Sequence, residues 1–217
     1  MPARRTRPGD PPDPRAGETD PADLDADPEA VARQICLRLL TAAPRTRAQL
    51  AEALRRRGVP DQAAETVLSR FAEVKLIDDA LFASAWVESR HYGRGLAGRA
   101  LAAELRHRGV PAQDIQAAVG QLDPEQEAAT ARALVARRLA GTRGQPLPAR
   151  VRRLVGLLAR KGYPPALAYR VVREALEQEG VDAAEAGLDL SDAPDPVQDG
   201  EPGQDWERGQ DGELSAW

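Results

Sequence analysis

The sequence predicts an all-α fold of three tandem three-helix repeats that stack into an elongated, curved, solenoid-like body. The first observation is a helix-ending motif (a base, Gly, an apolar residue and Pro) that occurs three times in the 217 residues. The second is that no segment alternates apolar and polar residues for long enough to form a strand. The third is that aromatic residues make up only 4% of the chain, so that Leu, Val and Ala must build the core, which suits closely packed helices. Because one repeat of roughly 50 residues is marginally stable alone, we expect the repeats to stack.

The repeated motif is centred on Gly58, Gly109 and Gly162. A glycine just after a helix adopts the left-handed conformation that ends it, and the preceding base complements the negative end of the helix dipole. The proline two residues later is expected to open the next helix, where its missing N–H does no harm. Leucines eight and four positions before each glycine mark one face of the preceding helix: Leu50 and Leu54, Leu101 and Leu105, Leu154 and Leu158.

A further helix precedes each of these Leu-Gly helices. Asp27 and Asp123, each followed by Pro, mark two of its starts, and the pair Asp78–Asp79 marks the third. Thr46 and Gln49 have the spacing of a capping box for the second helix of the first repeat. These signals divide the chain into an N-terminal tail at 1–27, three-helix repeats at 28–77, 78–122 and 123–178, and a C-terminal tail at 179–217.

The net charge of −4 conceals a separation of charge along the chain. Residues 29–178 carry 25 bases and 15 acids, whereas residues 1–28 sum to −3 and residues 179–217 to −11. Both tails are rich in Pro, Gly and Asp without periodicity, so we expect them to be disordered. The C-terminal tail either folds back on the basic core or only keeps the chain soluble. The core favours a polyanionic or acidic partner, although a solvated Arg-rich surface explains the same excess.

No catalytic, cofactor-binding or metal-binding pattern is found, so we expect a binding protein rather than an enzyme. The Gly-rich turn at 93–95 lacks the preceding strand of a dinucleotide-binding loop. Cys36 lies in an apolar helical stretch and is interpreted as core, and His107 as a surface base. One Cys and two His are too few for a metal site built on them, and no apolar run of 18 residues exists to span a membrane. We therefore expect a cytoplasmic monomer without a cofactor.

Basic residues are the candidates for partner contact because they gather at the ends of equivalent helices. Stacked repeats would place these clusters at regular intervals along one edge, which suits a nucleic-acid backbone or a protein filament. The alternative is that each base only complements its own helix end. Trp86, spaced helically from Phe82, favours burial over a stacking role. The candidate residues are Arg55, Arg56, Arg57, Arg90, Arg94, Arg99, Arg106, Arg108, Arg150, Arg152, Arg153, Arg160 and Lys161.

The middle repeat resembles the signature of the RecX family. The resemblance is carried by LIDDALFASAWVESR at 76–90 and GRGLAGRALAAELRHRGV at 93–110, and it extends more weakly over 29–178. It implies a three-unit helical layout and a regulatory protein that lies in the groove of the RecA recombinase filament. Such proteins restrain strand exchange and ATP hydrolysis, have some affinity for DNA, and thereby regulate DNA repair, homologous recombination and the SOS response. The acidic C-terminal tail and the Pro/Asp-rich N-terminus depart from the family.

Two other functions remain open from the residues alone. Residues 46–68 have the pattern of a helix-turn-helix, which predicts salt-sensitive duplex binding with sequence preference. The threefold recurrence of the motif argues against a single recognition helix. An adaptor for an acidic protein would instead bind its partner without changing recombinase ATPase activity.

Overall fold

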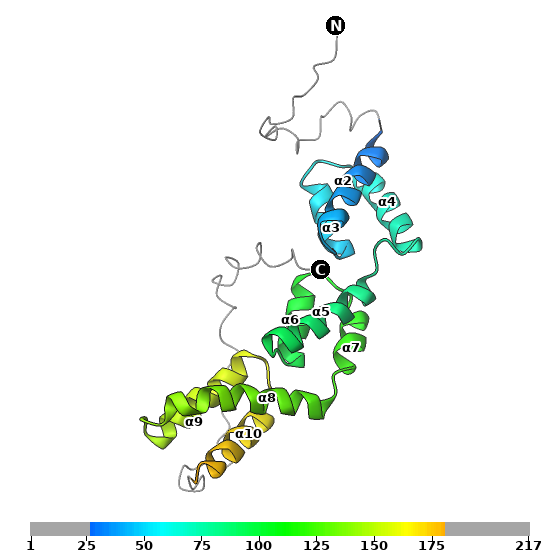
Figure 1. Ribbon diagram of the computed structural model, residues 1–217. Helices are drawn as coiled ribbons and strands as arrows, with labels where there is room; N and C mark the ends of the chain where they lie inside the picture. The colour runs from blue at the N-terminus through cyan, green and yellow to red at the C-terminus, as the bar shows by residue number, and fades with distance from the viewer. Residues whose placement is uncertain (1–26, 181–217) are drawn as a thin grey trace, which may run out of the picture. The chain divides into compact units, whose positions relative to one another are not determined.

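The computed structural model describes residues 27–180, and this part of the chain is helical without any strand (Figure 1). The predicted all-α class with three three-helix repeats is confirmed. Beyond Asp27, Glu179 and Gly180, the predicted tails lie outside the described residues. The helices are α2 (Pro28–Ala42), α3 (Arg47–Arg55), α4 (Asp61–Glu73), α5 (Asp79–Arg94), α6 (Gly98–His107), α7 (Ala112–Gly120), α8 (Pro124–Leu139), α9 (Leu147–Arg160) and α10 (Pro165–Gln178), with a 3₁₀ turn at Ala140–Thr142.

The first helix of each repeat begins where the sequence predicts. The Asp27 carboxylate accepts a hydrogen bond of 2.9 Å from the N–H of Ala30, and that of Asp123 accepts one of 3.0 Å from Glu125. Helix α5 begins at Asp79. Each carboxylate cap satisfies a backbone donor that the first turn of a helix leaves without an internal partner.

The capping box at the start of α3 is also confirmed. The Thr46 hydroxyl accepts from the Gln49 N–H at 3.2 Å, and the Gln49 side chain accepts from the Thr46 N–H at 3.2 Å. Helix α6, the equivalent helix of the second repeat, has Ala97 at its N-cap and so has no capping side chain of its own.

Glycines end the second helix of every repeat. Gly58, Gly109 and Gly162 have φ angles of 74°, 74° and 86°, in the left-handed region that a residue without a Cβ adopts readily. The prediction that each occupies the turn after a helix is therefore confirmed.

Each proline after these glycines lies at the N-cap of the next helix, one position before the first-turn position that the sequence predicts. Pro60, Pro111 and Pro164 are N-cap residues with ψ angles of 138°, 143° and 143°, and the next helix begins at the following residue. The carbonyl of Pro60 accepts the N–H of Ala64 at 3.0 Å, the first bond of α4. Proline suits this place because its ring fixes φ for the turn and the residue contributes only its carbonyl to the helix.

Each repeat has an apolar core that contains the leucine pair of the repeated motif, and Ala97 of the second repeat packs into the core of the third. Cys36 is fully buried in the first core, as predicted, and burial raises the pKa of its thiol to about 11. The motif leucines Leu50, Leu54, Leu101, Leu105, Leu154 and Leu158 are each at most 1% exposed.

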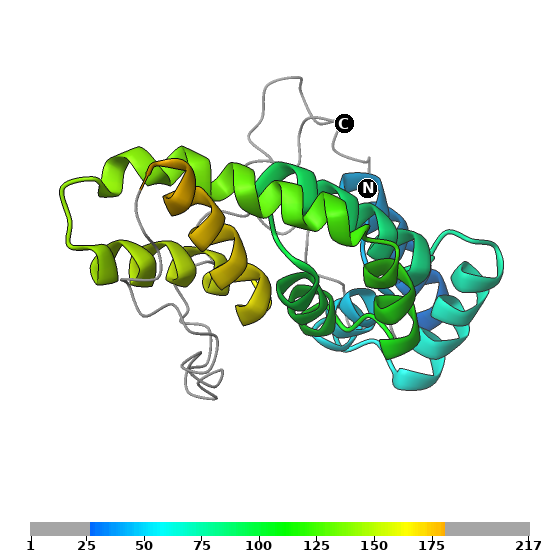
Figure 2. The ribbon, with the colours of Figure 1, turned by 90° about the horizontal axis from the view of Figure 1, so that it is seen from below.

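The chain divides into two compact units, of which the first ends at Asp78 and the second begins at Asp79. The first unit contains α2–α4, and the second contains α5–α10. In the third repeat α8 and α9 lie side by side and α10 packs across both (Figure 2). The elongated, curved arrangement of all three repeats stays a prediction.

Candidate partner-binding surface

The base directly before each turn glycine is half-buried and engaged within its own unit. Arg57 donates from Nη1 to the Ala53 carbonyl at 2.9 Å, and the Arg108 guanidinium lies 3.7 Å from the ring centre of Trp86. Lys161 donates from Nζ to the Arg94 carbonyl at 2.6 Å. These three residues were predicted as partner contacts, and the structure gives each of them an internal structural role.

The bases one and two positions earlier in the same turn are exposed instead. Arg55 and Arg56 both form ion pairs with the carboxylate of Glu52, which lies three and four residues earlier. In α6 the corresponding residues are Arg106 and His107. In α9 the corresponding cation is Arg160. The three equivalent helices therefore share an exposed cationic last turn, although the base nearest the glycine faces inward.

Trp86 lies at the centre of a charged cluster on the surface between α5 and α6. The Arg90 guanidinium lies 4.2 Å from its ring centre, in addition to that of Arg108 at 3.7 Å. The indole Nε1 donates to Glu104 at 2.8 Å, and Phe82 stacks on the indole at a centroid distance of 5.7 Å.

This arrangement makes Trp86 half-buried rather than fully buried. The indole face attracts the guanidinium groups, and Glu104 offsets their charge, lying 3.9 Å from Arg90. The guanidinium groups of Arg90 and Arg108 are consequently fixed in position beside the indole, and the phenyl ring of Phe82 also packs against it. The expectation that Trp86 is buried is therefore met only in part: the side chain is half-buried, and it packs against charged side chains as well as against Phe82.

The second and third repeats meet at the loop between α5 and α6. The Ala97 N–H donates to the Lys161 carbonyl at 2.9 Å, and the Tyr163 hydroxyl donates to the Gly95 carbonyl at 3.1 Å. With the Lys161–Arg94 bond, three hydrogen bonds tie the turn after α9 to this loop. Burial lowers the pKa of Lys161, and the neighbouring charges of Arg94 and Arg137 lower it further. The junction therefore gathers positive charge from α5, α8 and α9.

Helix α8 supplies the cap that α6 lacks. The Glu127 carboxylate accepts a hydrogen bond of 2.9 Å from the N–H of Gly98, the first residue of α6. Burial raises the pKa of Tyr163 to about 12, and the charge of Glu127 contributes to that rise. A negative carboxylate also complements the positive end of the α6 dipole.

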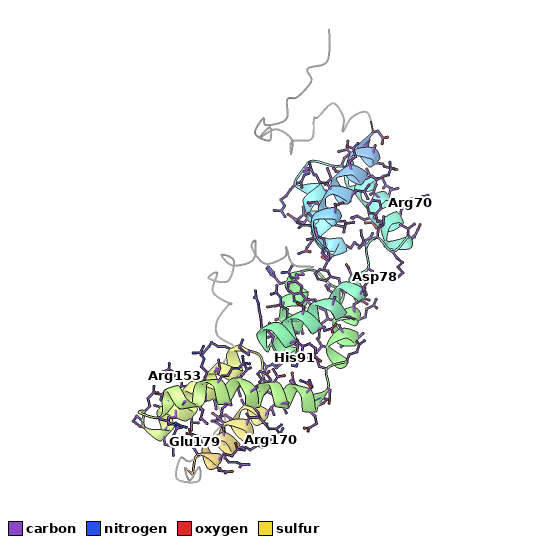
Figure 3. All side chains as sticks on the ribbon, in the orientation of Figure 1. Arg70, Asp78, His91, Arg153, Arg170 and Glu179 are labelled. Carbon is purple, nitrogen blue, oxygen red and sulfur yellow. The ribbon has the colours of Figure 1, made fainter. Side chains whose placement is uncertain are left out.

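The side chain of His91, on α5, is hydrogen-bonded to the same loop (Figure 3). Its ring is 1% exposed, and Nδ1 lies 2.9 Å from the Leu96 carbonyl, to which it donates. Nε2 lies 3.2 Å from the Thr130 hydroxyl on α8. The side chain is thus hydrogen-bonded on both edges and acts as a structural link between α5, the loop and α8.

Gly162 brings the two repeats into close backbone contact. A Cβ at this position would lie 2.5 Å from the Ala100 backbone nitrogen, which is closer than carbon atoms of side chains approach. Two features therefore require glycine at this position: its positive φ, and the lack of space for a Cβ beside the neighbouring repeat.

Arg150 lies inside the third repeat, 6% exposed, although it was predicted as a partner contact. Its Nε donates to the Thr142 hydroxyl at 3.1 Å, and its Nη2 pairs with the Glu179 carboxylate. Arg143 pairs with the other oxygen of Glu179 at 2.8 Å. The hydrogen bonds from Arg150, and then those from Arg143, lower the pKa of Glu179.

The remaining candidates lie on the surface of the second unit. Arg94 ends α5, and Arg99 lies in the first turn of α6. Arg99 and Arg106 are seven residues apart, so both lie on one exposed stripe of α6. Arg152 and Arg153 are exposed on α9, where Figure 3 labels Arg153.

Sequence reasoning missed Glu127, Arg137 and Glu179. Glu127 acts across the junction of two repeats, 29 residues from Gly98, whereas Arg137 acts on Lys161 within the third repeat, from 24 residues away. Glu179 was assigned to the acidic tail. Its position at the end of an apolar-periodic helix was the available signal that it belongs to the third repeat.

Within residues 27–180 no three of the His, Cys, Asp and Glu side chains are grouped to hold a metal ion. None of the helices in that range combines the length and apolarity needed to cross a membrane.

The three-helix pattern can be compared with known families. Sequence profiles described as "RecX, first three-helix domain", "RecX, second three-helix domain" and "RecX, third three-helix domain" match residues 32–71, 78–119 and 125–172. The chain belongs to the RecX family. Its resemblance to that family, inferred from the middle repeat, is therefore confirmed across all three repeats.

RecX proteins of two named organisms are highly identical to this chain. The chain is 64% identical over 169 residues to "Regulatory protein RecX" of Thermobifida fusca, a match that covers 78% of this chain and 89% of the relative. It is 65% identical over 161 residues to the protein of the same name from Streptomyces coelicolor, covering 74% and 86%. The RecX family is one of regulatory proteins rather than a catalytic family.

Solved RecX structures share the fold. One crystal structure of the regulatory protein RecX has a TM-score of 0.63 at 25% identity, over 70% of this chain and 75% of the other. RecX from Lactobacillus salivarius has a TM-score of 0.65 at 15% identity, over 69% and 97%, and this second likeness concerns the fold alone.

Proposed function

We propose that this RecX-family protein binds the RecA recombinase filament as a cytoplasmic monomer and restrains its strand exchange and ATP hydrolysis. It acts by occupying the filament rather than by catalysis, and it thereby regulates recombination, DNA repair and the SOS response. Membership of the RecX family supports a regulatory role, and the family resemblance supports RecA as the partner.

The observation that carries the proposal is the exposed cationic last turn shared by α3, α6 and α9. It presents Arg55 and Arg56, Arg106 and His107, and Arg160 at equivalent places in three repeats. A filament offers the same surface on each successive protomer, so repeated weak contacts add through avidity. Single exposed charge pairs contribute at most about 1 kcal/mol, which makes repetition necessary for tight binding.

The test measures RecA-driven strand exchange and DNA-dependent ATPase activity while the concentration of this protein increases. We expect both activities to fall as the protein approaches stoichiometry with RecA. Unchanged activities at an excess of the protein would refute the function.

Charge reversal tests which surface is used. The triple variant Arg56→Glu, Arg106→Glu and Arg160→Glu reverses one exposed base in each equivalent helix. The matched control Arg33→Glu, Arg70→Glu and Arg170→Glu reverses three exposed bases on α2, α4 and α10. If each contact contributes about 1 kcal/mol, the first variant binds the filament about a hundredfold more weakly. Equal loss in both variants would assign the effect to net charge alone.

The same variants separate the other two functions. A direct DNA-binding regulator would lose duplex binding in the absence of RecA, with a salt dependence set by the number of phosphates contacted. An adaptor for an acidic protein would leave RecA ATPase unchanged in every variant.

A further inference from the structure

Helix α9 differs from its equivalents in having no acidic residue. Arg55 and Arg56 pair with Glu52 in α3, and Glu104 of α6 lies beside Arg90. In α9 every charge is positive. The exposed bases Arg152, Arg153 and Arg160 form what we call the α9 arginine face.

The three arginines lie on one side of the helix. At 100° per residue they fall within an arc of about 100°, with the small residue Gly156 between them. The Arg160 guanidinium lies over Gly156, 3.4 Å from where a Cβ would stand. No hydrogen bond or ion pair to an acid is found for these arginines within residues 27–180. An unneutralised row of this kind attracts an anionic chain.

The described chain ends beside this face. Glu179 follows α10 and pairs with Arg150, in the first turn of α9, and with Arg143. Arg153 is three residues after Arg150 and therefore neighbours it on the helix surface. The first acid at the end of the third repeat is thus already bound by arginines at one end of α9.

The sequence that follows has the complementary charge. Residues 181–195 contain five acids and no base, at intervals of three or four residues: Asp182, Glu185, Asp189, Asp192 and Asp195. From Arg150 to Arg160 is about 15 Å along the helix, which about five extended residues span. The segment is long enough to reach every arginine of the face.

We propose that residues 181–195 bind the α9 arginine face of the same molecule and that a polyanionic or acidic partner must displace them. The segment is tethered at Gly180, so its local concentration is of millimolar order and weak ion pairs suffice. Partner binding is then regulated at the third repeat, because α3 and α6 each contain an acidic residue and α9 contains none. Docking of this segment does not depend on the identity of the partner and is tested without RecA.

Zero-length cross-linking tests the contact in the full-length chain. Carbodiimide joins an amine to a carboxylate in direct contact, and Lys75 and Lys161 are the only lysines in the sequence. Arg153→Lys and Arg160→Lys place an amine on the face while keeping its charge, and Arg33→Lys places one on exposed α2 as a control. We expect peptides that join position 153 or 160 to residues 181–195 within the monomer. Coupling no greater than at position 33, or coupling only in dimers, would overturn the proposal.

Displacement is tested with heparin as the polyanion. One variant neutralises Asp182, Glu185, Asp189, Asp192 and Asp195 to Asn or Gln. The control neutralises five acids of the N-terminal segment (Asp10, Asp13, Glu18, Asp20 and Asp23), so that both have the same net charge. If the docked state is about 90% populated, the first variant binds heparin about tenfold more tightly than the control. Equal affinity would overturn the competition.

Discussion

The Glu127 carboxylate on α8 accepts a hydrogen bond of 2.9 Å from the backbone N–H of Gly98, the first residue of α6. One repeat thereby caps a helix of the repeat before it. Since Ala97 at the N-cap has no acceptor in its side chain, α6 depends on this cap from the neighbouring repeat. This explains in part why the second and third repeats form one compact unit.

Removal of this cap should loosen α6. Glu127→Ala leaves the half-buried Gly98 donor without its partner, and we expect the free energy of unfolding to fall by about 1–2 kcal/mol. Urea denaturation measures the loss, and amide exchange at residues 98–101 should accelerate. Glu125→Ala, an exposed residue of the same helix turn, is the control. A similar effect of both variants would contradict the capping role.

Gly162 should tolerate no side chain. Gly162→Ala meets both a positive φ and the Ala100 backbone at 2.5 Å, whereas Gly180 has φ 76° and no atom within 4 Å of a Cβ. We expect Gly180→Ala to cost about 1–2 kcal/mol for its conformation alone. Gly162→Ala should cost more, with separation of the repeat junction. Thermal unfolding compares the two, and equal melting temperatures would exclude the steric contribution.

The guanidinium groups on Trp86 should stabilise the α5–α6 contact. Arg108→Ala removes the group 3.7 Å from the ring centre, and we expect a loss of about 0.5–2 kcal/mol and a shift in indole emission. The measurement uses a background in which Trp206 and Trp217 are replaced by Phe, so that Trp86 alone is observed. Arg106→Ala should leave stability and emission nearly unchanged, because Arg106 is exposed.

The ion pairs of Glu179 should make the third repeat sensitive to acid. Hydrogen bonds from Arg150 and Arg143 lower its pKa in the folded state. Their stabilisation is therefore complete above the ordinary Glu pKa and is lost as pH falls through the lower pKa of the folded protein. Urea unfolding between pH 7 and pH 3 should show Glu179→Gln less stable than the natural chain at pH 7, with the difference shrinking on acidification. A constant difference would contradict this assignment, and exposed Glu177→Gln provides the control.

The Cys36 thiol should report unfolding of the first unit. Its pKa of about 11 and its complete burial leave little thiolate at neutral pH. We expect a thiol reagent such as a disulfide dye to react only as fast as the first unit opens, and to react at once in urea. Rapid reaction in the native protein would show that α2 separates readily from α3 and α4.

Local signals determined the secondary structure. Periodic leucines, turn glycines and the caps at Asp27, Thr46 and Asp123 act within a few residues of one another, so their consequences can be predicted from sequence. The sequence predicted these prolines in the first turn, whereas they lie at the N-cap. The two positions are hard to tell apart from sequence because proline has nearly the same φ in both.

The candidate surface was predicted in part. The helix ends that carry bases were identified correctly, but whether a base faces solvent or its own unit depends on what packs against it. Arg108 faces Trp86 from another helix, and Arg150 faces Glu179 from the end of α10. Such partners lie 22 and 29 residues away, where no local pattern connects them.

From the sequence by itself follow the helices, the threefold repeat, the separation of charge and the family resemblance, because each depends on short-range spacing or composition. The tertiary structure decided which repeats share one unit, which arginines are buried, and that Glu127 caps a helix of the neighbouring repeat. The physical reason is that burial, ion pairing and capping in trans are properties of surfaces brought together from distant segments, and their geometry exists only after those segments have packed.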